Sequence, residues 1–130
     1  MAPAGKEEVF LDLRGRGLTA EGIHKMFPPP AYFTAMADGA AIPDKAALMG
    51  TLADAFRFPS YFGRNWDALL DCLRSLPGEI PAGGYVLGLT NSGAFLSSSA
   101  KDREDFDFIV REAAAFLKEK FKAEFKVVFF

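Results

Sequence analysis

Two carboxylates stand one helical turn apart in the stretch FPSYFGRNWDALLDCLRSL, residues 58–76. Asp67 and Asp71 would lie on one face of a helix, because residues four positions apart are neighbours on a helix surface. Carboxylates placed in this way can accept paired hydrogen bonds from the basic side chains of a partner. Arg64 and Arg74 flank the pair at three residues on either side. The same spacing therefore also fits a solvated helix face that carries two internal ion pairs.

Helical periodicity predicts that the helix carrying these carboxylates is half buried. At about 100° per residue, the charged residues and Ser75 fall on one arc of the helix. Asn65 can cap its first turn, and we expect the helix to begin there and to close near Pro77-Gly78. The remaining arc holds the apolar residues Trp66, Leu69, Leu70, Cys72, Leu73 and Leu76.

Apolar runs predict three strands, at 9–13, 85–89 and 125–130. The middle run is almost wholly apolar, which suits a strand covered on both faces. Residues 31–43 are rich in alanine and glycine and give no firm signal. Strands that alternate with helices favour parallel pairing. We therefore expect an α/β fold, with a small three-stranded parallel sheet and helices packed against it.

Caps and apolar spacing predict the other helices. Asp44 can cap a helix that ends before Pro59, and Thr19 can cap a short one. Residues 28–30, three consecutive prolines, predict a surface turn. A longer helix is expected from about 102 to 122. Its buried stripe should comprise Phe106, Ile109, Val110, Ala113, Phe116 and Leu117.

Composition favours a single soluble domain. The chain has 130 residues, half of them apolar, with fourteen phenylalanines and a net charge of −2. This near-balanced charge argues against direct nucleic-acid binding, which usually needs a basic face. A lone cysteine cannot form an internal disulfide, and residues 1–10 lack the apolar run of a secretory signal. Without an apolar run of roughly 20 residues we expect no membrane association and a cytoplasmic location.

The sequence offers little for catalysis, and we expect no enzyme activity, catalytic residue, metal or cofactor. Asp67 and Asp71 share one exposed face, whereas glycosidic hydrolysis needs two carboxylates across a cleft. His24 is the sole histidine, and Cys72 falls on the apolar arc, so no metal-ligand cluster has suitable spacing. The chain also lacks a phosphate-binding loop and a nucleophile elbow.

The most specific pattern in the chain is the run Tyr61-Phe62-Gly63-Arg64-Asn65-Trp66-Asp67-Ala68-Leu69-Leu70-Asp71-Cys72-Leu73. Without a gap, this run resembles the inhibitory segment of the barstar family. Members of this family are intracellular protein inhibitors of ribonucleases such as barnase. The preceding helix, Pro59 and the later strand–helix–strand order also fit the family pattern. The resemblance covers about residues 42–130. It implies a single barstar-like domain over 1–130, with an insertion at 16–41.

The resemblance implies a binding function without chemistry of its own. In this family the helix and the loop before it enter the ribonuclease active site and block it. The implied partner is a barnase-like or other small microbial ribonuclease or toxin, and the implied role is that of a monomeric antitoxin or immunity protein. By position, Asp71 matches the dominant anchor and Asp67 its partner one turn earlier. Tyr61 matches the loop contact over the active-site histidine.

Further partner contacts follow from the same resemblance. Gly63 would keep the loop backbone close to the enzyme. Alternatively, it could only provide the backbone conformation of a turn. Trp66, like Tyr61, could simply pack against the protein. Glu112 resembles a glutamate that pairs with a nuclease arginine. The full set of implied partner-binding residues is Tyr61, Phe62, Gly63, Asn65, Trp66, Asp67, Leu70, Asp71, Arg74 and Glu112.

Three residues depart from the family pattern. Arg64 stands where the family carries an acidic residue, Arg74 replaces a small polar one, and Leu70 replaces an aromatic. The two cations reduce the negative potential beside the carboxylates. A partner with complementary acidic groups would accommodate them. The alternative is a non-inhibitory interaction module that keeps the fold and binds another basic protein.

Overall fold

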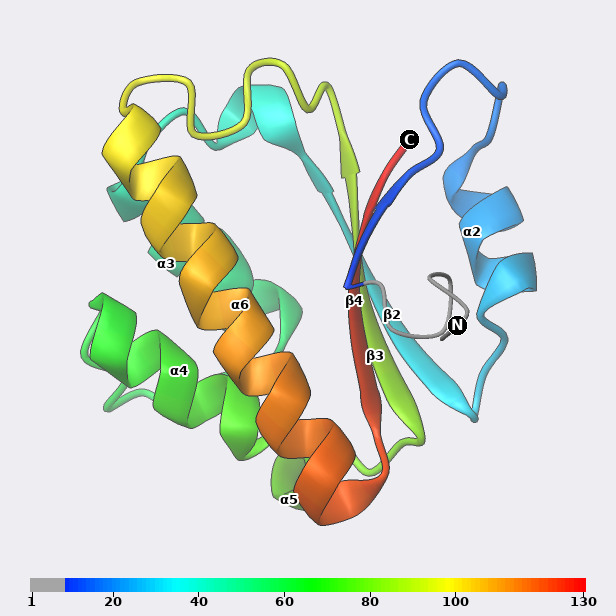
Figure 1. Ribbon diagram of the computed structural model, residues 1–130, viewed down its shortest axis with the longest axis vertical. Helices are drawn as coiled ribbons and strands as arrows, with labels where there is room; N and C mark the ends of the chain where they lie inside the picture. Colours follow the sequence, from blue (N-terminus) through cyan, green and yellow to red (C-terminus); the bar gives the residue numbers. More distant parts are fainter. Residues whose placement is uncertain (1–8) are drawn as a thin grey trace, which may run out of the picture.

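The computed structural model describes residues 9–130, which form a four-stranded sheet with helices on both faces (Figure 1). In chain order the elements are β1 (Phe10–Asp12), α2 (Ala20–Met26), β2 (Tyr32–Asp38), the 3-10 turn η1 (Gly39–Ala41), α3 (Lys45–Ala55), α4 (Trp66–Arg74), α5 (Leu76–Glu79), β3 (Gly84–Thr90), α6 (Ala100–Phe121) and β4 (Glu124–Phe129).

All neighbouring strands of the sheet are parallel, in the order β1-β4-β3-β2. In the two inner strands Leu87 pairs with Val127, and on its other side Leu87 pairs with Ala35 of β2. The predicted α/β class and parallel pairing are confirmed. Each crossover contains a helix, as parallel connections require.

The prediction of three strands is wrong, because β2 is a fourth. Its sequence, YFTAMAD, has two alanines and a threonine in its middle, and alanine has a low strand propensity. Local preference is mixed, because Tyr32, Phe33 and Thr34 favour strands, and pairing with β3 along seven residues completes the strand. Tyr32 reinforces the edge by donating a hydrogen bond of 2.7 Å to Glu124 Oε1 of β4. This bond and partial burial raise the pKa of Tyr32 above its ordinary value.

The two faces of the sheet bury different amounts of apolar surface. Figure 1 places α3, α4, α5 and α6 on one side of the sheet and α2 on the other. Tyr85 and Leu87 of β3 face the larger core, whereas Val86 packs with Ile23 of α2 and Val128 of β4 in a smaller one. The alternation follows from the two-residue period of a strand. Burial on both faces of β3, as predicted, is confirmed.

Most helix boundaries follow the predicted caps. The Asp44 carboxylate accepts a hydrogen bond of 2.9 Å from the Ala47 amide, and the Thr19 hydroxyl accepts one of 3.3 Å from the Gly22 amide. The long helix α6 begins two residues earlier than expected, after its cap Ser99. The expected turn at 28–30 is present.

The predicted end of the carboxylate-bearing helix is wrong by about one turn. α4 ends at Arg74, where the Ser75 amide donates to the Asp71 carbonyl at 3.1 Å. The short helix α5 then starts at Leu76 and contains Pro77 in its first turn. Proline is tolerated there, because the first amides of a helix have no internal acceptor. Pro77 therefore opens a new helix where the sequence suggested a terminator.

Three further expectations concern the N-terminal segment, membrane-spanning helices and residues 16–41. The expected lack of a secretory signal concerns residues 1–10, of which residues 1–8 lie outside the described part of the chain. Within residues 9–130, every helix is too short or too polar to cross a bilayer. The stretch 16–41 holds α2, β2 and η1. Its assignment as an insertion in a single domain stays a prediction.

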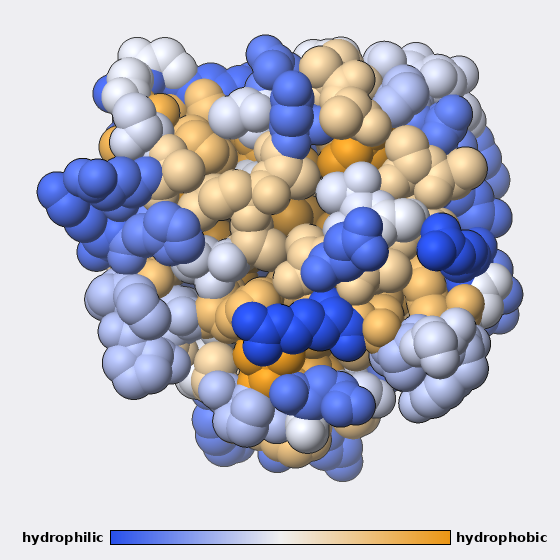
Figure 2. Space-filling model, turned by 180° about the vertical axis from the view of Figure 1, so that it is seen from behind, coloured by the Kyte–Doolittle hydropathy of each residue, from blue (hydrophilic) through white to orange (hydrophobic). Residues whose placement is uncertain are grey.

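Several arginines cover phenylalanine rings at the protein surface. Figure 2, seen from the side opposite to Figure 1, shows apolar side chains gathered near the middle of the surface with charged side chains between them. The Arg57 guanidinium lies 5.4 Å from the centroid of the Phe33 ring, and the Arg111 guanidinium lies 4.8 Å from that of the Phe10 ring. Such contacts are worth about 0.5–1 kcal/mol at exposed sites. They let an aromatic-rich chain keep ring faces near water.

Phe56 lies at the centre of the aromatic packing that supports the site, and its truncation should be costly. The side chain is 1% exposed, and the rings of Phe33, Phe58 and Phe125 lie 5.9, 6.3 and 5.9 Å away. We predict that Phe56→Ala lowers the free energy of unfolding by about 3–5 kcal/mol, measured by urea denaturation. Phe108→Ala, at a 61% exposed position, should change it by about 0.5 kcal/mol or less. Equal losses in the two variants would contradict the packing described.

Candidate functional site

Aromatic side chains anchor the loop between α3 and α4 to the core. Phe62 is 9% exposed and meets Phe58 edge-on, with ring centroids 5.0 Å apart. The Phe62 amide also donates a hydrogen bond of 3.0 Å to the Pro59 carbonyl, which closes a turn. Tyr61, the neighbouring residue, is left 84% exposed. Phe62 is therefore a support of the loop, and its expected contact with a partner stays a prediction.

Asn65 joins the loop to the helix. Its side-chain oxygen accepts a hydrogen bond of 2.8 Å from the Ala68 amide, and its side-chain nitrogen donates one of 3.4 Å to the Gly63 carbonyl. The predicted cap is thereby confirmed. Arg64 has a φ of 56°, in the left-handed region that non-glycine residues rarely adopt. The left-handed residues of this loop are Arg57 and Arg64, whereas Gly63 has no positive φ, so the backbone does not require a glycine at Gly63.

Helix α4 turns its carboxylates to solvent. Leu69 and Leu73 are 0% and 1% exposed and belong to the main core, whereas Asp67 and Asp71 are exposed. Within residues 9–130, neither carboxylate forms a hydrogen bond or an ion pair. Asp67, in the first turn, is favoured by the positive end of the helix dipole. The exposure expected from helical periodicity is confirmed.

The internal ion pairs that the spacing also allowed are not formed in the described structure. The Arg74 guanidinium lies 5.1 Å from the centroid of the Phe116 ring on α6 and does not reach Asp71. An Arg64 Nη atom lies 3.5 Å from the position that a side chain on Gly50 of α3 would occupy. Arg74 is thus stacked on α6 and the exposed Arg64 lies near α3, and neither forms an ion pair with the carboxylates of α4.

Two further candidates on α4 are partly buried. Trp66 packs against the main core at one edge, and the Lys45 ammonium lies 5.5 Å from its ring centroid. Leu70 also packs partly against the core. Both side chains therefore combine a structural role with some remaining exposed surface.

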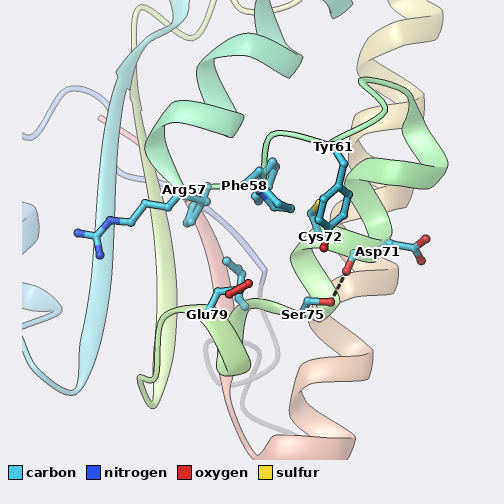
Figure 3. A pocket seen from close by; sticks show the side chains of 10 residues that line it. Arg57, Phe58, Tyr61, Asp71, Cys72, Ser75 and Glu79 are labelled. Atoms are coloured by element: carbon cyan, nitrogen blue, oxygen red, sulfur yellow. Dashed lines mark hydrogen bonds between the residues drawn. The ribbon is translucent and has the colours of Figure 1, made fainter.

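A small cavity lies beside the exposed tyrosine (Figure 3). In this view the Tyr61 ring lies next to Cys72, and the Asp71 carboxylate points away from the cavity. The volume is about 100 Å³. Its walls are formed by Phe56, Arg57, Phe58, Pro59, Tyr61, Asp71, Cys72, Ser75, Leu76 and Glu79. Ser75 and Glu79 were missed as candidates, although they continue the four-residue spacing that begins at Asp67 and Asp71.

The surroundings of Cys72 disfavour its thiolate form. Burial raises the pKa of the Cys72 thiol, and the nearby carboxylates of Asp71 and Glu79 raise it further. A raised thiol pKa lowers the fraction of thiolate, which is the reactive species. Among residues 9–130, no three potential ligands gather to hold a metal ion. His24 instead shares a hydrogen bond with Thr34, which links α2 to β2.

Glu112 lies on α6, exposed to solvent, one turn before Phe116. Residues four apart share a helix face, so Glu112 lies on the side of α6 that carries Phe116 and, stacked on it, Arg74 of α4. The fold thus brings a residue from α6 to the neighbourhood of the α4 face. Its pairing with a nuclease arginine stays a prediction.

Sequence comparison places this geometry in a known family. A family model described as Barstar (barnase inhibitor) matches residues 32–129. The chain belongs to the barstar family. The matched region includes β2, α3, the loop 57–65 and α4, and it runs to the end of β4. The resemblance noted over residues 61–73 is thereby confirmed.

A curated relative of this barstar-family chain comes from Bacillus subtilis (strain 168) and is named "Putative ribonuclease inhibitor YrdF". The two sequences are 35% identical over 85 residues. The alignment covers 65% of this chain and 89% of the relative.

The cap of α4 can be tested by substitution. Asn65→Ala removes the acceptor of the Ala68 amide, and we predict a loss of about 1 kcal/mol in the free energy of unfolding. Asn65→Ser keeps an acceptor oxygen and should lose clearly less. Urea denaturation of the three proteins measures both effects. Equal stability of wild type and Asn65→Ala would contradict the cap.

Proposed function

We propose that this barstar-family protein inhibits a ribonuclease by placing α4 and the preceding loop in the enzyme's basic active site. The observation that carries the proposal is the exposed pair Asp67 and Asp71, which have no internal partner in the described structure. The exposed Tyr61 lines the same cavity as Asp71. Family membership and the name of the relative from Bacillus subtilis support the same function.

The carboxylates act as substitutes for RNA phosphates. An active site that binds phosphate presents arginine, lysine and histidine donors, and a carboxylate accepts such donors at short distance. Asp71 is the main anchor, and Asp67 reinforces it one turn earlier. Since neither side chain has an internal ion pair, binding breaks no internal salt bridge. Attraction between the acidic face and a basic cleft also accelerates encounter.

The loop contributes a rigid contact. Tyr61 covers the active-site histidine, while Phe62 and Phe58 hold the loop backbone from the core side. A loop fixed before binding loses less conformational entropy on association. Gly63, Asn65, Trp66 and Leu70 line the entry to the helix and complete the surface.

The partner that fits this site is a small microbial ribonuclease, barnase-like or a toxin of similar chemistry. The protein would act as a cytoplasmic antitoxin or immunity protein, as a monomer, without a cofactor and without direct contact to nucleic acid. It would not be an enzyme, because Cys72 is a poor nucleophile and the carboxylates share one open face.

The second candidate function is a non-inhibitory module that binds another basic protein. Exposed Arg64, next to the carboxylates, favours it, because a cation there weakens attraction to a basic cleft. Inhibition assays against a panel of small microbial ribonucleases at low salt separate the two functions. No inhibition at micromolar protein would favour the module.

The anchor can be tested by removing one carboxylate. Asp71→Ala should weaken binding to the inhibited ribonuclease by more than about 2 kcal/mol, or about 30-fold, as measured by titration calorimetry. The fold should persist, because the side chain is exposed. Glu104→Ala removes an exposed carboxylate from α6, away from the proposed site, and should have little effect. An unchanged affinity of Asp71→Ala would refute the anchor.

Salt dependence tests the electrostatic part of the proposal. Because added ions screen exposed charges, the association rate should fall as salt rises, while the dissociation rate changes little. Stopped-flow mixing at several ionic strengths measures both rates. An association rate independent of salt would contradict electrostatic steering.

A further inference from the structure

Arg74 is positioned in an unusual way at the end of the acidic face. Its guanidinium stacks on the Phe116 ring at 5.1 Å, and the side chain is half-buried. The Nε atom is buried without a hydrogen-bond acceptor. Among the described residues no carboxylate forms an ion pair with Arg74, although Asp71 lies three residues earlier. The positive charge is fixed in place and unneutralised.

The surroundings of Arg74 strengthen any ion pair formed there. Phe121 is 51% exposed and packs beside Phe116, with ring centroids 6.2 Å apart. An apolar rim lowers the local dielectric once a partner excludes water, which increases the attraction between opposite charges. A planar guanidinium already held by stacking also loses little freedom on binding. Arg74 is therefore prepared to receive a carboxylate from outside the chain.

We propose that Arg74 selects the target, which presents an acidic side chain beside its basic active site and pairs this acid with Arg74. The inference rests on the proposed inhibition of a ribonuclease. A ribonuclease with only basic groups at that position would be repelled by Arg74 or would leave its charge desolvated. Specificity follows, because the same contact that attracts one partner penalises another.

Substitution of Arg74 tests the inference on the ribonuclease that the wild-type protein inhibits most strongly. Arg74→Met keeps an apolar stem on Phe116 and removes the charge, and it should raise the inhibition constant at least tenfold. Arg74→Lys keeps the charge without the planar fork and should give an intermediate value. The matched control is Arg111→Met, which removes a guanidinium stacked on Phe10 at 4.8 Å. The control should stay within twofold, and thermal unfolding verifies that all variants fold.

Charge reversal in the enzyme identifies the acid. Each acidic residue around the active site of that ribonuclease is replaced by lysine, one at a time. For one such enzyme variant, the inhibition constant of the wild-type inhibitor should rise at least tenfold. Against this same enzyme variant, Arg74→Glu should have an inhibition constant at least threefold lower than that of the wild-type inhibitor. This pattern would be specific for a direct pair.

Three outcomes overturn the inference. Inhibition that stays within twofold in Arg74→Met while Asp71→Ala abolishes it would reject the role of Arg74 and leave the proposed function intact. The absence of any acidic residue that couples to Arg74 would have the same meaning. Failure of the wild-type protein to inhibit any ribonuclease of the panel would reject the proposed function and this inference with it.

Discussion

Helix α4 can bury only one of its faces, and this constraint determines the site. Leu69 and Leu73 must leave water, whereas an ionised carboxylate without a partner is costly to bury. Asp67 and Asp71 are therefore directed to solvent by the packing of the opposite face. The loop before the helix obeys the same rule, since burial of Phe62 leaves Tyr61 outside. An exposed face that carries Asp67, Asp71 and Tyr61 is thus produced by ordinary core formation.

The second organising feature is the placement of positive charge on aromatic rings. Guanidinium groups lie over phenylalanines on three helices or their ends, in the pairs Arg57–Phe33, Arg74–Phe116 and Arg111–Phe10. None of these three arginines forms an ion pair with a carboxylate of the described residues. A chain with a net charge of only −2 can therefore still present an unpaired acidic face. Net charge is a poor guide to local potential in such a protein.

Local signals in the sequence predicted the parts of the fold that depend on local physics. Asp44, Asn65 and Thr19 cap helices as expected, because a cap needs only a side chain and an amide three residues on. The exposure of Asp67 and Asp71 also followed from helical periodicity alone. Strand β2 did not, because its stability comes from pairing with β3, some fifty residues later in the chain.

The remaining differences have the same origin. The position of the Arg74 side chain depends on Phe116, which belongs to another helix, so spacing within α4 could only suggest a pair with Asp71. Pro77 is permitted in the first turn of a new helix, and nothing local announces that α5 starts there. The ungapped run 61–73 indicated the candidate site because its residues are consecutive. Ser75 and Glu79 also line the cavity, but Glu79 lies on the separate helix α5, so spacing within one helix does not place it.

The strand order has a consequence for the biosynthesis of the protein. β4, residues 124–129, lies between β1 and β3, so a nascent chain that has exposed only the first three strands has a gap in its sheet. Phe125 of this strand also packs on Phe56, beneath the loop that carries Tyr61. The ribosome must therefore translate and release residue 129 from its exit tunnel before the sheet closes. A nascent chain that lacks β4 therefore has neither the closed sheet nor the Phe125–Phe56 contact beneath this loop.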